Sequence, residues 1–252
     1  MSLRIISKSS QAYGAFNGGQ IIENKPIGFP QDGGFVRPYS NLFYWARAEA
    51  VIDSTIGLHP HQGFEIMSFI LEGTIRHFDT KMDAWKELDA GSAQIIRAGN
   101  GISHAEHMNK GSVMFQIWVD PNLSVTMEKE ASYDDYSAKD LPVEESDAVK
   151  TITYAGGNGP MKLDADLSIQ KMTILSDYTL DLNEGHVASL YIIDGAGSCN
   201  GDSIESDDYI IAEDLDKLQI NPVGGSMEIF IIQSPKEIAY PTYAEIMQRR
   251  IS

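Results

Sequence analysis

Apolar residues in this chain are grouped into short runs, and helical periodicity is almost absent before the C-terminal end. Clear examples are residues 41–52, 64–71, 92–98 and 113–119, which are rich in the aromatic and β-branched side chains that strands favour. Gly, Asp and Asn separate the runs. Many short strands with regular turns are typical of a sandwich or a barrel, so we expect an all-β fold.

The strand pattern is interrupted once and ends in a different pattern. Residues 120–148 are acidic and poorly periodic, and we interpret them as a connector with one short helical turn. The connector suggests two domains, residues 1–135 and 136–252. At the C-terminal end, Ile246, Met247 and Ile251 are spaced as one helical face, which predicts a short helix packed on a sheet.

The charge and the termini limit the kinds of partner. The chain has 19 basic and 36 acidic residues, a net charge of −17, which repels nucleic acid phosphates and anionic membranes. The N-terminus lacks the apolar segment of a signal peptide, and no apolar run is long enough to span a bilayer. We therefore expect a cytoplasmic protein that binds neither nucleic acid nor membrane directly. The one cysteine, Cys199, excludes an intrachain disulfide and is expected to be a small packed side chain.

Two pairs of residues with metal-binding side chains carry the chemistry. In His59-Pro60-His61 and in His104-Ala105-Glu106 the first and third residues point to the same face of a strand. If two such strands meet inside a barrel, three imidazoles and one carboxylate converge and leave one or two coordination positions open. Such donors accept Fe, Mn, Co, Ni, Cu and Zn. The alternative for a lone His-x-His pair is two surface histidines.

The other metal-binding residue types receive different predictions. Glu65 is the rival carboxylate, but it is expected to point to the other side of its strand and to make structural hydrogen bonds. His107 follows Glu106 directly and should face away from the metal. His77 and Asp79 are expected to make turn hydrogen bonds. His186 has no partner at a suitable spacing and is expected not to be a ligand.

The two halves also show a faint internal repeat. FILEGTIRH (69–77) is similar to YIIDGAGSC (191–199), which aligns Gly73 with Gly195. Counting along the chain from these matches predicts which residues of the second half replace the four metal-binding side chains of the first: Asp181, Asn183, Gln219 and Asn221. The second half should therefore have the same fold and bind no transition metal tightly.

LHPHQGFEIMSFILEG (58–73) and AGNGISHAEHM (98–108) resemble the two signature segments of the pirin family, which belongs to the cupin superfamily, and QIWVDPN (116–122) continues the similarity. The resemblance implies a bicupin of two antiparallel β-barrel (jelly-roll) halves, in which the N-terminal half binds iron and the C-terminal half lacks the ligands. It implies four ligands: His59, His61, His104 and Glu106. Gln62 and Asn100 depart from the pattern, because pirins commonly have Arg at both positions; the changes remove positive charge near the mouth of the site.

The resemblance leads to two functional hypotheses. The first is an iron-dependent dioxygenase, similar to quercetin 2,3-dioxygenase, in which a flavonol or other enolic substrate reacts with O2 and Glu106 takes the enol proton. The second is a non-enzymatic protein that senses the oxidation state of its iron and binds a protein partner. We expect Fe(II) as the cofactor in both.

Overall fold

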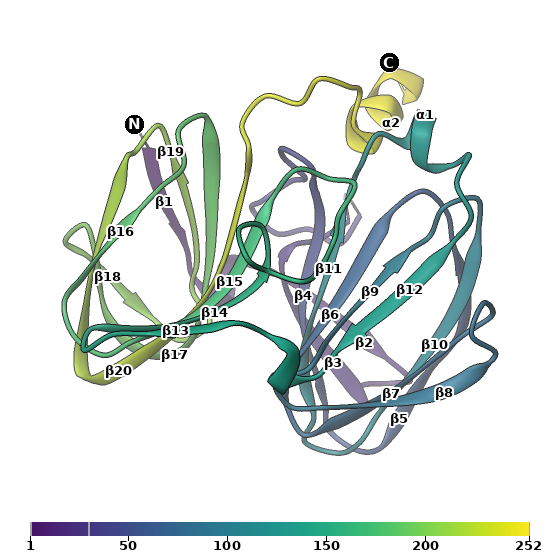
Figure 1. Cartoon of the computed structure of the whole chain (residues 1–252), viewed down its shortest axis with the longest axis horizontal. Helices are drawn as coiled ribbons and strands as arrows, with labels where there is room; N and C mark the ends of the chain where they lie inside the picture. The colour runs from purple at the N-terminus through teal and green to yellow at the C-terminus, as the bar shows by residue number, and fades with distance from the viewer. Residues whose placement is uncertain (1, 30, 252) are drawn as a thin grey trace. The chain divides into compact units, whose positions relative to one another are not determined.

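The computed structural model describes residues 2–29 and 31–251. The chain forms two compact units (Figure 1). The histidine unit comprises Gln11–Asp140 and Ala239–Ser252, and the second unit comprises Met1–Ser10 and Leu141–Ile238. The prediction of an all-β fold with a short C-terminal helix, α2 (Tyr243–Ile251), is confirmed. The side chain of Ile251, part of the predicted helical face, lies outside the described residues.

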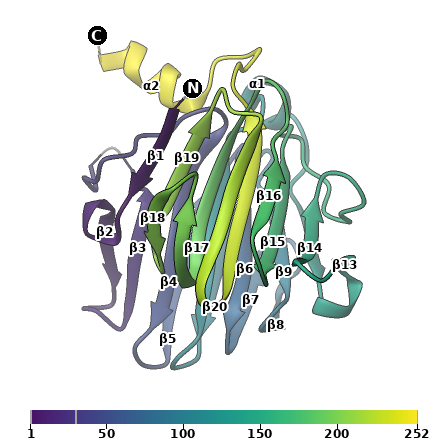
Figure 2. The ribbon, with the colours of Figure 1, turned by 90° about the vertical axis from the view of Figure 1, so that its left-hand side faces the viewer.

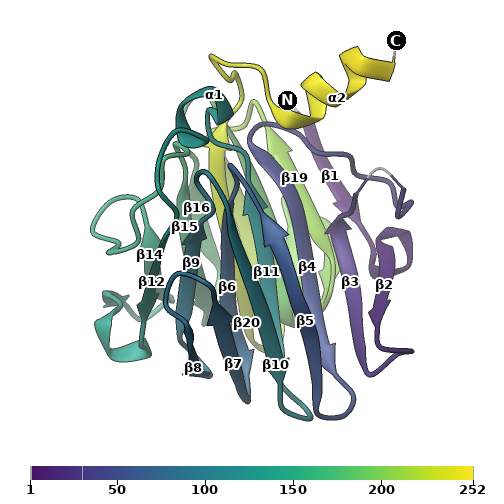
Figure 3. The same ribbon diagram turned by 90° about the vertical axis from the view of Figure 1, so that its right-hand side faces the viewer.

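The histidine unit contains two antiparallel sheets. The larger sheet has the strand order β12-β9-β6-β11-β4-β3-β2, and the smaller one has the order β5-β10-β7-β8, seen in Figure 3. Strands of the larger sheet are β2 (Ala12–Phe16), β3 (Ile21–Ile27), β4 (Leu42–Ala50), β6 (Glu65–Glu72), β9 (Ala93–Arg97), β11 (Val113–Val119) and β12 (Ser132–Tyr136). Strands of the smaller sheet are β5 (Ser54–His61), β7 (Thr74–Asp79), β8 (Ala84–Asp89) and β10 (Ile102–Met108).

The second unit contains one antiparallel sheet with the strand order β1-β19-β17-β20-β15-β14-β13 (Figure 2). In addition, β16 pairs with β20 and β18 pairs with β17. Its strands are β1 (Ser2–Ile6), β13 (Val143–Glu145), β14 (Val149–Ala155), β15 (Ser168–Ile174), β16 (Tyr178–Asp181), β17 (His186–Cys199), β18 (Asp202–Glu205), β19 (Tyr209–Glu213) and β20 (Lys217–Pro235). The short helical turns are η1 (Lys8–Ser10), α1 (Leu123–Thr126) and η2 (Ala138–Asp140).

The predicted runs of the first half became β4, β6, β9 and β11, and their apolar side chains form the core. The expected connector differs from the prediction, because β12 lies within it and pairs with β9. β12 is an edge strand in which every residue is partly or fully exposed, so its sequence has no apolar run. The ends of the chain also differ from the expected division at residue 135: β1 pairs with β19 and joins the second unit, whereas residues 239–252 join the histidine unit.

The two units share a pattern of strand pairing, as the faint repeat predicted. In the histidine unit the small sheet runs β5-β10-β7-β8; in the second unit β16, the start of β20, the end of β17, and β18 pair in the same order. Gly73 lies between β6 and β7, and Gly195 lies at a register shift inside β17. Both have positive φ angles, +69° and +96°, which glycine adopts without a steric cost.

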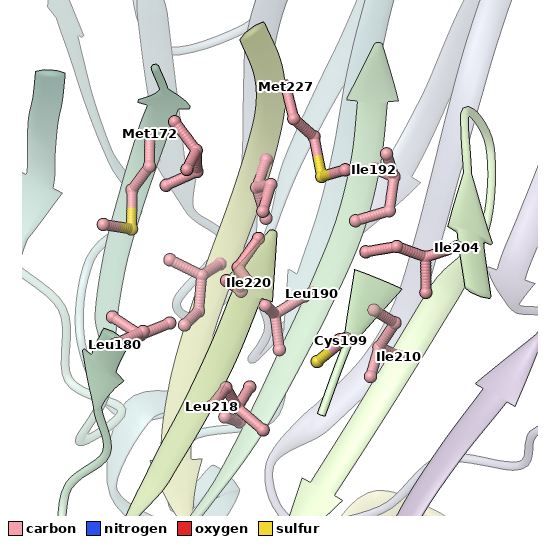
Figure 4. Close-up of a cluster of buried hydrophobic side chains, with 14 of the residues drawn as sticks. Met172, Leu180, Leu190, Ile192, Cys199, Ile204, Ile210, Leu218, Ile220 and Met227 are labelled. Carbon is pink, nitrogen blue, oxygen red and sulfur yellow. The ribbon is translucent and has the colours of Figure 1, made fainter. Parts of the chain in front are cut away.

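The residue-by-residue count across this repeat was wrong by one position. Asp181, Asn183 and Gln219 are exposed. The side chains that point inward are apolar: Leu218 and Ile220 on β20 and Cys199 on β17, all fully buried in the cluster of Figure 4. Because side chains alternate between the faces of a strand, a shift of one residue exchanges inside and outside.

Candidate metal centre

Two neighbouring strands carry the four predicted ligands. β5 and β10 run antiparallel, with His104 opposite His59 and Ile102 opposite His61. The register then shifts between His104 and Glu106, so Glu106 pairs with Ile56. His59 and His61 are partly exposed, whereas His104 and Glu106 are fully buried. The small sheet therefore brings all four side chains to one region, with the accessible end at the two residues of β5.

The three histidines form one tight group. Their ligand atoms all lie within 4.8 Å of one another. The Nε2 atoms of His61 and His104 are only 2.9 Å apart. The Nδ1 atom of His59 lies 2.7 Å from the carbonyl oxygen of Gly57, which accepts its proton and leaves Nε2 with a free lone pair. These contacts fix the rings in orientations suited to ligands.

Burial keeps two of the imidazoles neutral. Desolvation, with a smaller contribution from neighbouring histidines, lowers the pKa of His61 to about 3 and that of His104 to about 2. Neutral imidazole is the form that binds a metal ion, because only an unprotonated nitrogen has a lone pair to offer.

Glu106 lies beside His104 but not in the group of three histidines. It belongs to a second, fully buried group with His77 and His104, again within 4.8 Å. Its Oε1 accepts a hydrogen bond from Ser68 Oγ (3.2 Å), and its Oε2 accepts one from Gln116 Nε2 (2.7 Å). His104 is shared by both groups, so it connects the carboxylate to the imidazoles of β5.

The remaining predictions can now be compared with the structure. Glu65 lies outside both groups and is buried 3.9 Å from Arg97. His107 contacts the hydroxyl of Thr55 at 2.8 Å. His186 hydrogen-bonds the carbonyl oxygen of Glu184. Neither histidine belongs to a metal-binding group among the described residues.

The prediction for His77 was wrong. This residue is fully buried on β7, opposite Glu106 on β10, and its ring lies 5.6 Å from that of His104. Asp79 does make the predicted turn contacts, since its Oδ1 accepts hydrogen bonds from the backbone nitrogens of Lys81 and Met82. His77-Phe78-Asp79 is a third pair at i, i+2 spacing, and this signal could have placed His77 on the inner face.

Two cavities of the histidine unit bear on the site, and His61 lines one of them. The first, of about 520 Å³, is lined by His61 and by polar groups that include Gln62, Thr80 and Asn100. Gln62 and Asn100 therefore lie at the mouth of the site, as expected. The second, of about 670 Å³, is lined mainly by aromatic and apolar side chains: Phe29, Phe43, Phe64, Trp118, Tyr243 and Met247. Trp118 lines this second cavity, and its ring lies 4.7 Å from that of His61.

The donor set fits a transition metal. Two imidazole nitrogens bound to one ion at ~2.1 Å and at a right angle would lie ~3.0 Å apart, close to the 2.9 Å between His61 and His104. In the described part of the chain, the buried Nδ1 of His104 has no hydrogen-bond partner. A buried polar atom is rarely left unpaired, and His104 is the residue that both groups share.

Comparisons with known proteins show that the chain is similar to pirins and quercetin 2,3-dioxygenases. Residues 35–119 match the family model described as Pirin. A quercetin 2,3-dioxygenase of Escherichia coli is 30% identical over 127 residues, 48% of this chain and 50% of that protein. Pirin-1 of Arabidopsis thaliana is 31% identical over 170 residues, 61% of this chain and 56% of that protein. The chain therefore aligns with about half the length of these relatives.

The fold comparison extends over nearly the whole chain. The crystal structure of the bacterial pirin YhhW from Escherichia coli, in complex with nickel(II), superposes with a TM-score of 0.77 at 19% identity and covers 94% of this chain and 100% of that one. The resemblance to pirins that the two histidine segments suggested is confirmed. No helix among the described residues combines the length and apolar character needed to cross a bilayer.

Proposed function

Because the chain resembles pirins and quercetin 2,3-dioxygenases in sequence and a bacterial pirin in fold, we propose that it is a mononuclear iron dioxygenase that acts on quercetin-like flavonols or related enolic compounds with O2. The observation that carries the proposal is the group of three converging histidines beside a buried carboxylate. His61 lines the polar cavity, and its ring contacts Trp118, which lines the aromatic one.

His59, His61, His104 and Glu106 would hold the ion, and we propose Fe(II). When bound, it supplies a Lewis acid that lowers the pKa of an enol oxygen and a centre at which O2 can react. The same donors accept Mn, Co, Ni, Cu and Zn, so the loading of the purified protein depends on metal availability.

The protein's own groups would bind the substrate and move its proton. The aromatic cavity suits a planar ring system, because aromatic side chains stack on such rings or contact their edges. Glu106 would accept the enol proton, since among the described residues each of its oxygens accepts one hydrogen bond and keeps a further lone pair. Burial around Glu106 excludes bulk water from the proton acceptor.

Oxygen uptake with quercetin tests the proposal on three samples: the iron-loaded protein, Glu106→Gln, and His61→Ala as a control with weakened metal binding. We expect uptake by the wild type that vanishes in Glu106→Gln while iron stays bound. If all three samples take up oxygen at the same slow rate as free iron, the dioxygenase proposal is refuted. The alternative, a non-enzymatic redox sensor that binds a protein partner, would then be favoured. The cytoplasmic location remains a prediction.

A further inference from the structure

A buried pair, His77 and Asp79, lies behind the candidate metal centre. Both side chains are fully buried, and His77 Nε2 lies 2.9 Å from Asp79 Oδ2. Asp79 Oδ1 accepts hydrogen bonds from two backbone N–H groups, those of Lys81 and Met82, which hold the side chain in one orientation. His77 Nε2 donates to Asp79 Oδ2, and His77 Nδ1 is then the acceptor that faces the amide nitrogen of Gln94.

The side-chain amide of Gln94 on β9 connects His77 to Ser68 by hydrogen bonds. Its Nε2 lies 3.3 Å from His77 Nδ1 and 3.1 Å from Ser68 Oγ, and its Oε1 accepts the hydroxyl of Tyr133 at 3.1 Å. All the hydrogen-bonding capacity of the amide nitrogen is used. If the amide were reversed, its oxygen would face the lone pair of His77 Nδ1. Asp79 thus sets the orientation of Gln94 through His77.

Ser68 connects Gln94 to the carboxylate of Glu106. Since Ser68 Oγ accepts from Gln94, its own proton is free to donate to Glu106 Oε1. On the other side Trp118 Nε1 donates to Gln116 Oε1 at 3.2 Å, and Gln116 Nε2 donates to Glu106 Oε2. Two series of donors thus end on Glu106, one from Gln94 through Ser68 and one from Trp118 through Gln116. Both oxygens are therefore held in one orientation, with neutral donors that leave the charge on the carboxylate.

We propose that His77, oriented by Asp79, is a positioning residue that fixes Glu106 in the metal centre through Gln94 and Ser68. This inference rests on the proposed function, because it assumes that Glu106 serves the bound ion. It gives His77 a role distinct from that of a ligand, although its ring lies near His104. Partners behind metal ligands commonly change metal affinity by 10–100-fold when they are removed.

The test uses Co(II) alone as the probe and its visible absorption as the readout, with no substrate. The samples are the wild type, Ser68→Ala, His77→Phe, and the double variant; His77→Phe keeps a ring to stack on Tyr133, which lies 4.8 Å away. We expect each single variant to bind Co(II) 10–100-fold more weakly and to shift the absorption bands in the same way. The double variant should be no weaker than the weaker single variant, because both changes break one chain of contacts. Ser68→Thr, which keeps the hydroxyl, should restore affinity and bands.

Two further variants keep the test decisive. If His77→Phe does not fold, Gln94→Met replaces it in the same cycle, because methionine has a similar length and no donor. Tyr133→Phe is the matched control, since it removes a contact of Gln94 but leaves both of its N–H groups in place; its affinity should stay close to that of the wild type.

The outcomes separate this inference from the function on which it rests. A wild type that binds no Co(II) would overturn the metal centre and this inference together. A wild type that binds Co(II), with additive losses in the double variant or full affinity in Ser68→Ala, would overturn the role of His77 alone. Loss of the metal in His77→Phe with an unchanged spectrum in Ser68→Ala would make His77 a direct ligand instead.

Discussion

The Nε2 atoms of His61 and His104 lie 2.9 Å apart, although the two residues are 43 positions apart in the chain. Neither ring is protonated at neutral pH, because burial lowers both pKa values. Two neutral imidazoles can share only one proton between these nitrogens, or both can direct lone pairs at a single ion. The second arrangement places the centre of any bound metal close to both atoms.

One tight transition-metal ion per chain is the first expected outcome. The equivalent inner positions of the second unit hold Leu218, Ile220 and Cys199, which offer no imidazole or carboxylate. Burial also raises the pKa of the Cys199 thiol to about 11, so it stays protonated. A calorimetric titration of the metal-free protein with Ni(II) or Co(II) measures the stoichiometry. Two tight equivalents, or one that survives in His61→Ala with full affinity, would contradict this assignment.

Replacing Glu106 by Gln should damage turnover more than metal retention. The three imidazoles remain, while a neutral amide cannot accept the enol proton, and losing a general base typically lowers the rate by 10²–10⁴-fold. The new amide nitrogen of Glu106→Gln would lie on the Ser68 side, because Gln116 Nε2 can only donate and needs the amide oxygen of the substituted residue as its acceptor. The Ser68 hydroxyl can rotate to accept the hydrogen bond from that nitrogen. Iron content by elemental analysis and quercetin-dependent O2 uptake are measured on the same samples. Wild-type turnover with normal iron would exclude Glu106 as the base.

The residues of β5 and β10 show how much of the site the sequence predicts. The i, i+2 spacing identified which side chains share a face, and this depends only on local strand geometry. Which strands meet, and where a strand shifts register, depends on pairing over long distances, so the separation of Glu106 from His59 and His61 by the irregularity in β10 could not be read from spacing.

The fold was predictable in type but not in its connections. Apolar runs marked β4, β6, β9 and β11, since most residues of each strand are buried. The polar β12 was missed because it is an edge strand without a fully buried residue, so it lacks the apolar run that marks a core strand. The pairing of β1 with β19 was missed as well, because no local pattern specifies a partner about 200 residues away.

Gly99 should be the glycine near the site that tolerates substitution least. Its φ is +51°, and a Cβ there would lie 2.6 Å from the carbonyl oxygen of Lys129 and 2.8 Å from the nitrogen of Ala131. Because both contacts are backbone atoms, Gly99→Ala should lower the free energy of unfolding by roughly 2–4 kcal/mol. Gly57→Ala is the control, since no atom lies within 4 Å of its Cβ position. Equal midpoints of urea unfolding in the two variants would refute the predicted clash.

Asp120 should make the histidine unit less stable as the pH rises. Burial raises the pKa of this carboxyl to about 6, and the hydrogen bond that its Oδ2 accepts from the backbone nitrogen of Tyr243 only partly opposes that shift. Within the described residues its Oδ1 has no hydrogen-bond partner. The folded state therefore binds more protons than the unfolded state between about pH 4 and 6, and stability falls as the pH rises through this window.

The isosteric change Asp120→Asn tests this prediction, because asparagine keeps an oxygen to accept the Tyr243 N–H but carries no charge. We expect the variant to be more stable than the wild type by roughly 1–2 kcal/mol at pH 7.5 and to show no such gain at pH 4. The contact between the Tyr240 hydroxyl and the Asp120 carbonyl oxygen stays in place, so α2 keeps its attachment in both proteins. Urea unfolding of the metal-free proteins at the two pH values gives the difference. A gain of the same size at both would show that ionisation of Asp120 is not the cause.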